Sequence, residues 1–162
     1  LQQPECQGRV RVRRKLHGLT GPMLPARTFS VTIPGDWRAL YDRIWRPDFF
    51  ARWASGLTDS DLVADGDAWV AAGPDGPIRL RFTPHNDFGV MDHWVDAGAG
   101  PVIHIPLRVV ANGDGAEVML TLYRQPDMSD ERFAADIKWI NRDLNALKSL
   151  VTGNPRDHRV RS

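Results

Sequence analysis

The first regular pattern in the sequence is an alternation of polar and apolar residues at positions 28–33. Thr and Ser residues separate three large apolar residues in this segment. Such alternation is typical of a strand that buries one face. The Pro34-Gly35 pair follows directly and predicts that the strand ends there.

Two short helices are predicted after this strand. Asp36 is a suitable N-cap for the first helix. Apolar residues then follow at helical spacing, at Trp37, Leu40, Tyr41, Ile44 and Trp45. Pro47 favours the first turn of a second helix, which would carry aromatic residues up to Trp53 and end at Gly56.

Short segments separated by turns fill the middle of the chain. Strands are expected at 62–64, 68–72, 78–83, 89–96, 102–111 and 117–123. Connections this short cannot form parallel crossovers, so the pattern predicts an antiparallel meander. Pro106 lies within the fifth of these segments, and we expect a bulge there because proline cannot donate to the ladder.

A long helix is predicted near the C-terminus. Ser129 is a suitable N-cap, and Asp130 and Glu131 favour the positive end of the helix dipole. Apolar residues recur three and four positions apart at Phe133, Ile137, Ile140, Leu144, Leu147 and Val151. Gly153 and Pro155 predict the end of this helix.

These elements together predict an α+β fold in a single domain. A chain of 162 residues has the usual length of one domain. We assign the folded domain to residues 27–152, a basic and flexible N-terminal extension to 1–26, and a basic tail to 153–162.

The net charge of +1 hides an uneven distribution along the chain. Residues 1–27 carry six basic and one acidic side chain, residues 28–152 carry 12 and 18, and residues 153–162 carry three and one. Because phosphate neutralisation needs clustered Lys and Arg, the acidic domain is not expected to bind nucleic acid.

Composition indicates a soluble globular protein of a reducing compartment. Hydrophobic residues make up 42% and charged residues 25%, which is ordinary usage. Cys6 is the single cysteine and cannot form an intramolecular disulfide. No apolar run approaches the roughly 20 residues that span a bilayer, and no signal peptide is evident. A cytoplasmic location is therefore expected.

Several segments carry distinctive motifs. The first strand runs into Ile33-Pro34, and the sequence RPDFFARW follows at 46–53. The last helix ends in DLNALK at 143–148. More specific are GVMDH at 89–93 and IPLRVVANGDGAEV at 105–118. These segments resemble the helix-grip superfamily, which includes START-like and pollen-allergen-like proteins and the bacterial polyketide cyclase/dehydrase-like branch, together called SRPBCC proteins.

This resemblance implies both the fold and the kind of partner. A curved antiparallel sheet of about seven strands, in the order β-α-α-β6-α, would wrap around the long C-terminal helix. The space between sheet and helix would hold a small hydrophobic molecule. We expect no cofactor, and we expect a monomer or a homodimer.

Candidate site residues are those that the pattern turns toward the interior. The predicted ligand contacts are Trp53, Leu80, Phe82, Met91, His93, Ile105, Leu107, Leu120, Phe133, Ile137 and Ile140. Arg81 is predicted to orient a polar end of the ligand.

His93 is the candidate catalytic residue. Its ordinary pKa of about 6.5 suits a general acid or base, although a neutral pocket residue would fit the same position. Asp92 points to the opposite side of a regular strand, so the adjacency of the two residues argues against a catalytic dyad. His104 and Arg108 are expected to face outward.

Other catalytic chemistries have little support in the sequence. The spacings among His85, Asp87, His93 and His104 match no compact zinc signature. No serine lies in a G-x-S-x-G setting, and no glycine-rich phosphate loop is present. We therefore expect no metal.

Three functions remain open from the sequence. The first is binding of a hydrophobic or aromatic small molecule, such as a lipid or a polyketide. The second is a cyclase, aromatase or dehydratase that uses His93 for proton transfer. The third is a protein-interaction module that uses the outer sheet face and the basic tails.

Overall fold

The computed structural model describes residues 23–54, 61–73, 76–98 and 100–153. Cys6, Gly56 and Pro155 lie outside the described residues, as do most of the two predicted tails. The division into one domain and two tails therefore stays a prediction.

The described residues form eight strands and three helices. In chain order these are β1 (Ala26–Pro34), α1 (Trp37–Ile44), α2 (Pro47–Phe50), β2 (Val63–Asp65), β3 (Ala68–Gly73), β4 (Gly76–Phe82), β5 (His93–Asp96), β6 (Ile103–Ile105), β7 (Leu107–Asn112), β8 (Gly115–Tyr123) and α3 (Asp130–Thr152).

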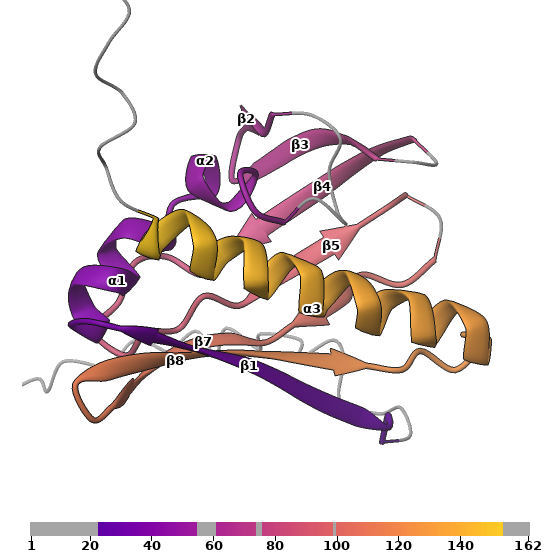
Figure 1. The fold of residues 1–162 in the computed structure, drawn as a ribbon. Coiled ribbons are helices and arrows are strands. Elements are labelled where there is room, and N and C mark those ends of the chain that lie inside the picture. Colours follow the sequence, from indigo (N-terminus) through magenta and orange to yellow (C-terminus); the bar gives the residue numbers. More distant parts are fainter. Residues whose placement is uncertain (1–22, 55–60, 74–75, 99, 154–162) are drawn as a thin grey trace, which may run out of the picture.

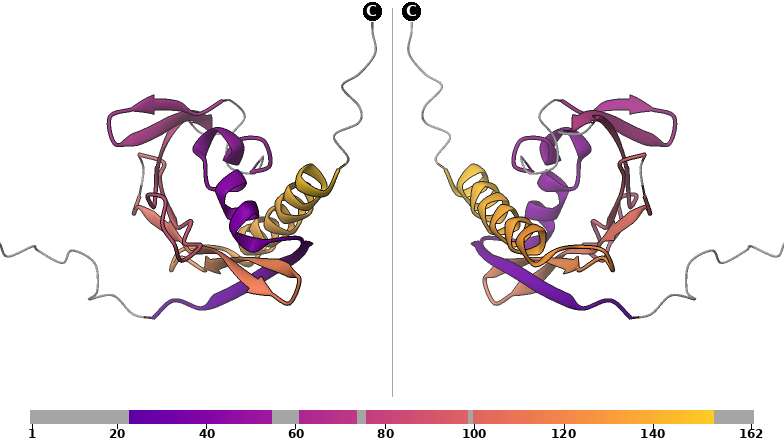
Figure 2. Two further views of the ribbon diagram at one scale, coloured as in Figure 1. Left: turned by 90° about the vertical axis from the view of Figure 1, so that its left-hand side faces the viewer. Right: turned by 90° about the vertical axis from the view of Figure 1, so that its right-hand side faces the viewer.

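The strands form a curved antiparallel wall around the helices. The ladder order is β1-β8-β7 in one sheet and β2-β3-β4-β5-β6 in the other. Seen end-on, the strands trace an arc, with α1, α2 and α3 on its concave side (Figure 2). Helix α3 runs along the sheets from one end to the other (Figure 1). The α+β prediction, with a curved sheet around a C-terminal helix, is confirmed.

Both long helices begin as the sequence predicts. The Asp36 side chain accepts a hydrogen bond from the Ala39 backbone N–H at 2.9 Å at the start of α1. The Ser129 side chain accepts one from the Arg132 N–H at 3.2 Å at the start of α3. Each cap satisfies a backbone donor that has no partner within its helix.

The number of strands differs from the expected seven because Pro106 divides one of them. Val90 pairs with Arg108 and His93 pairs with Ile105, which is one continuous antiparallel register. Pro106 lies between β6 and β7, and its carbonyl accepts a hydrogen bond from the Thr121 N–H of β8 at 2.9 Å. On the side of residues 89–96, the ladder is interrupted without a shift in phase because the Leu107 N–H donates to the Asp92 side chain. As a result, β6 and β7 fall in different sheets.

At this break, the carboxylate of Asp92 takes the place of a backbone acceptor. Asp92 Oδ1 accepts a hydrogen bond from the Leu107 backbone N–H at 3.0 Å. On its other oxygen, Asp92 lies 3.1 Å from His104 Nε2, and Arg108 also forms an ion pair with this carboxylate. His104 and Arg108, which are predicted to face outward, thus both contact the Asp92 carboxylate.

The strand expected at 89–96 is shorter in the structure, where β5 begins at His93. Gly89 has a φ of 67°, a left-handed conformation that favours glycine. Its carbonyl accepts a hydrogen bond from the Val109 N–H at 2.8 Å. Residues 89–91 therefore follow β7, whereas β5 pairs with β4 and β6.

Gly89→Ala should lower the free energy of unfolding by about 3 kcal/mol or more. A Cβ at this position would collide with the Val109 carbonyl oxygen, in addition to the cost of the left-handed conformation. Gly113→Ala is the matched control, since Gly113 has a φ of 60° with open space around it; it should cost about 1–2 kcal/mol. Urea unfolding measures both, and equal losses would show that the close approach is unimportant.

Asp92→Ala should lower the free energy of unfolding by about 2–3 kcal/mol, because the Leu107 N–H loses its acceptor and Arg108 loses its carboxylate. Asp92→Asn retains an oxygen that can accept from the Leu107 N–H, so a smaller loss is expected. Denaturant titration of the two variants separates the hydrogen bond to the Leu107 N–H from the charge interaction with Arg108. If Asp92→Asn lost as much stability as Asp92→Ala, the charge of Asp92 would be the more important of the two.

Candidate functional site

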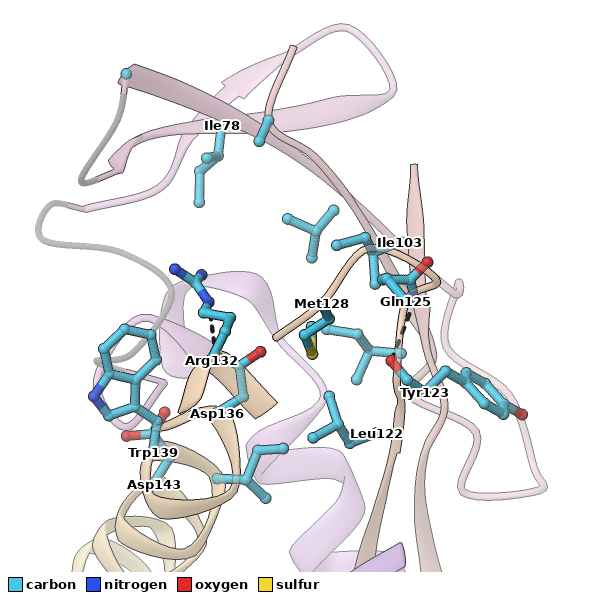
Figure 3. A pocket seen from close by; sticks show the side chains of 15 residues that line it. Ile78, Ile103, Leu122, Tyr123, Gln125, Met128, Arg132, Asp136, Trp139 and Asp143 are labelled. Carbon is cyan, nitrogen blue, oxygen red and sulfur yellow. Dashed lines mark hydrogen bonds and ion pairs between the residues drawn. The ribbon is translucent and has the colours of Figure 1, made fainter. Parts of the chain in front are cut away.

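A cavity of about 240 Å³ lies between α3 and the five-stranded sheet. Figure 3 shows side chains reaching it from the sheet on one side and from the helix on the other. The lining residues are Gly76, Ile78, Val95, Ala97, Ile103, Ile105, Leu122, Tyr123, Gln125, Met128, Arg132, Asp136, Trp139, Ile140 and Asp143.

The sheet side of the cavity is apolar. Ile78 of β4 and Val95 of β5 are buried, and Ile103 and Ile105 of β6 pack against the same apolar cluster. Alternate residues of a strand face the same side of a sheet. The strand pattern therefore builds a continuous hydrocarbon wall.

The turn after β8 closes one side of the cavity. Gln125 Nε2 donates to the Tyr123 carbonyl at 3.2 Å. The Arg124 guanidinium donates to the Met128 carbonyl at 3.0 Å and pairs with Asp130 at 2.6 Å. These contacts fix the turn that places the flexible Met128 side chain against the cavity.

The helix side carries the charged groups. Arg132 Nε lies 3.2 Å from Asp136 Oδ1, one helical turn further along α3. The guanidinium of Arg132 also lies 5.6 Å from the centre of the Trp139 ring. Burial raises the pKa of Asp136 above its ordinary value, and the nearby Arg132 opposes this shift. Asp143 completes the stripe and is itself buried.

Comparison with solved structures identifies the architecture. DynU16, a protein from the dynemicin biosynthetic locus, superposes with a TM-score of 0.59 at 14% identity, covering 80% of this chain and 48% of that one. The allergen Ara h 8.0201 gives 0.58 at 10% identity over 82% and 100% of the two chains. The Aha1 dimer from Colwellia psychrerythraea gives 0.60 at 15% identity over 81% and 99%.

The chain has the helix-grip fold. The resemblance to the SRPBCC superfamily is thereby confirmed for the fold, and identities this low carry the fold alone. No protein-family model matches the sequence, and no curated protein matches it. The chain spans about half the length of DynU16.

Within this helix-grip fold, two of the predicted ligand contacts line the cavity: Ile105 and Ile140. Most of the others fill the core at the centre of the sheet, namely Trp53, Leu80, Phe82, Met91, His93, Leu107 and Leu120. Phe133 and Ile137 are half-buried on α3. The Phe133 ring lies under the Arg124 guanidinium, at 5.4 Å.

Arg81 lies away from the cavity. Arg81 is exposed, and its neighbour Leu80 is fully buried, so the two side chains lie on opposite faces of β4. Arg81 instead lines a hollow on the outer face with Arg79 and Trp94. Its role in orienting a ligand stays a prediction that this placement does not favour.

His93 lies in an aromatic cluster and not along the cavity. Its ring centre is 5.0 Å from that of Phe50 and 5.8 Å from that of Phe82. Its Nδ1 is 3.5 Å from the Met91 carbonyl oxygen, and burial lowers the pKa of His93 to about 4. The ring is therefore neutral near pH 7. An acid–base role stays a prediction that this placement does not favour.

The polar residues of the cavity were not singled out in the sequence. Arg132, Asp136, Trp139 and Asp143 follow one another at helical spacing, and the Arg-Asp pair four residues apart is a recognisable signal. A search restricted to apolar residues selects Phe133 and Ile137 on the same helix. Each of these follows by one residue a side chain that lines the cavity, namely Arg132 and Asp136.

Two general features complete the description of the site. Among the described residues, no group of three or more His, Cys, Asp or Glu side chains could hold a metal ion. Within the same part of the chain, no helix is both long and apolar enough to cross a membrane.

The buried His93 should make stability depend on pH between about 6.5 and 4. The unfolded chain takes up a proton in this range while the native chain does not, so the contribution is complete above pH 6.5 and is lost as the pH falls to about 4. The loss should reach about 3 kcal/mol. Urea unfolding across this range should show a shallower pH dependence for His93→Leu than for the wild type.

Phe82→Leu is the control for that measurement, because it alters the same aromatic cluster and retains His93. Its pH dependence should follow the wild type. If His93→Leu also followed the wild type, the neutral buried state of His93 would be refuted.

Proposed function

We propose that this protein binds one small, mainly apolar molecule in the cavity between α3 and the five-stranded sheet. The observation that carries the proposal is the division of the cavity into a hydrocarbon wall on the sheet and a few charged groups on the helix. Small-molecule sites typically combine an apolar lining with a few polar groups that fix orientation. The apolar wall supplies affinity, and the helix orients the ligand.

The cavity volume limits the size of the ligand. Drug-sized ligands occupy pockets of about 300–1,000 Å³, and this cavity measures about 240 Å³. It suits one or two rings or a short alkyl segment. A sterol or a complete polyketide would be held by one part only, with the rest outside.

The structural neighbours support ligand binding in general terms. The helix-grip fold is shared with DynU16, a protein from the dynemicin biosynthetic locus. An aromatic or polyketide-type compound is therefore one chemical class to test. Lipids with a short buried segment are another, because the sheet side of the cavity is hydrocarbon.

We prefer the ligand-binding hypothesis over the enzyme hypothesis because of the position of His93. A general acid or base must come within hydrogen-bond reach of its substrate, and His93 does not line the cavity. Its pKa of about 4 also makes it a weak base near neutral pH. The described residues offer no observation that favours the cyclase alternative.

Native mass spectrometry of the protein purified from its own host tests the proposal directly. We expect a co-purifying small molecule that leaves when the protein is denatured. The neutral probe 2-phenylethanol provides a second measurement, in which two-dimensional NMR should show shifts at residues lining the cavity. Fragment-sized probes of this kind are expected to bind weakly, in the millimolar range.

Ile103→Trp should abolish binding of 2-phenylethanol, because the larger side chain would occupy the cavity. Val102→Trp is the matched control: Val102 is the adjacent residue, exposed and on the outer hollow, and this variant should bind as the wild type does. An unchanged affinity in the Ile103 variant, or NMR shifts confined to the outer face, would contradict the proposed site.

A further inference from the structure

The charges that line the cavity come from α3. Among the described residues of the lining, Arg132 is the only cationic one, and Asp136 and Asp143 are anionic. Asp143 has a second cationic neighbour outside the lining, because Arg142 Nε lies 3.8 Å from Asp143 Oδ1. The charge that a ligand meets therefore depends on how Arg132 and Asp136 are exposed.

Arg132 and Asp136 contact each other but differ in exposure. Arg132 Nε lies 3.2 Å from Asp136 Oδ1, and the guanidinium lies 5.6 Å from the centre of the Trp139 ring. The Arg132 side chain is 58% exposed, whereas that of Asp136 is 16% exposed. Water therefore screens the cation, while the carboxylate faces a less polar surrounding in which its interactions are stronger.

The arrangement along α3 places an apolar surface beside the carboxylate. Ile140 follows Asp136 by four residues and so lies on the same face of the helix, one turn away. Trp139 presents a second surface that attracts cations through its ring. Figure 3 shows Asp136 and Trp139 on the helix and Ile78, Ile103 and Leu122 on the other side.

We propose that the cavity selects ligands whose apolar body ends in a cationic group, such as an ammonium, and discriminates against carboxylates. The apolar body would contact the hydrocarbon wall of the sheet. The ammonium would donate to Asp136 and lie near Trp139. This inference rests on the proposed function, because it names the class of molecule that the same cavity binds.

Three probes with the same phenyl and two-carbon body test this selectivity: 2-phenylethylamine, 2-phenylethanol and phenylacetate. At pH 7.5 the first is cationic, the second neutral and the third anionic. NMR titration of the full chain should give an affinity for the amine about tenfold higher than for the alcohol, as expected for a charge-assisted hydrogen bond. Phenylacetate should bind more weakly than the alcohol.

Asp136→Asn should reduce the affinity for the amine to that for the alcohol and leave the alcohol unchanged. Asp114→Asn makes the same change in net charge at an exposed turn outside the cavity lining, and it should retain the preference for the amine. Both variants should unfold cooperatively, because the Asn side chain has nearly the same shape as Asp, and the titrations are run well below their melting temperatures.

The outcomes separate the two proposals. If none of the three probes binds, the proposed function fails and the inference fails with it. If the alcohol binds and the amine binds no better, or if phenylacetate binds equally well, the inference alone is overturned. It is also overturned if Asp136→Asn weakens the alcohol and the amine by the same factor, since Asp136 would then act on shape and not on charge.

Discussion

The division of the strands into two sheets depends on the Asp92 carboxylate. Its Oδ1 accepts a hydrogen bond from the Leu107 N–H at 3.0 Å, within a register that runs from the Val90–Arg108 pair to the His93–Ile105 pair. The backbone ladder therefore stops beside Pro106 and resumes in the second sheet. The two sheets together form one curved wall around the helices (Figure 2).

Large side chains decide which part of the concave side is hollow. Phe50, Trp53, Phe82 and His93 pack together where the two sheets meet, with centroid distances of 5.0 to 5.8 Å. Side chains fill this region, and both Trp53 and His93 are almost completely buried in it. The remaining space lies toward the first half of α3, where the strands carry branched aliphatic residues. The neutral state of His93 follows from the same packing.

Local signals made much of this fold predictable from the sequence. Alternation in β1 and β4 assigned the buried faces, and Asp36 and Ser129 marked the helix starts that the structure contains. The same alternation places Arg81 on the opposite face of the strand from Leu80. The pattern itself therefore does not favour Arg81 as a ligand contact. The position of the cavity is different in kind. It depends on the summed volumes of side chains that are distant in sequence. Hydrophobic periodicity within one segment does not report these volumes.

The choice of residue at position 136 is best understood as a conflict between stability and binding. An apolar residue there would extend the hydrocarbon surface that Ile140 begins. Burial instead raises the pKa of Asp136, so the native protein holds the proton more tightly than the unfolded chain. Above that pKa, the ionised carboxylate therefore lowers the free energy of unfolding. Arg132 offsets part of this cost from an exposed position. A cation bound in the cavity would offset the remainder and favour the ionised carboxylate, which links occupancy of the cavity to the stability of the fold.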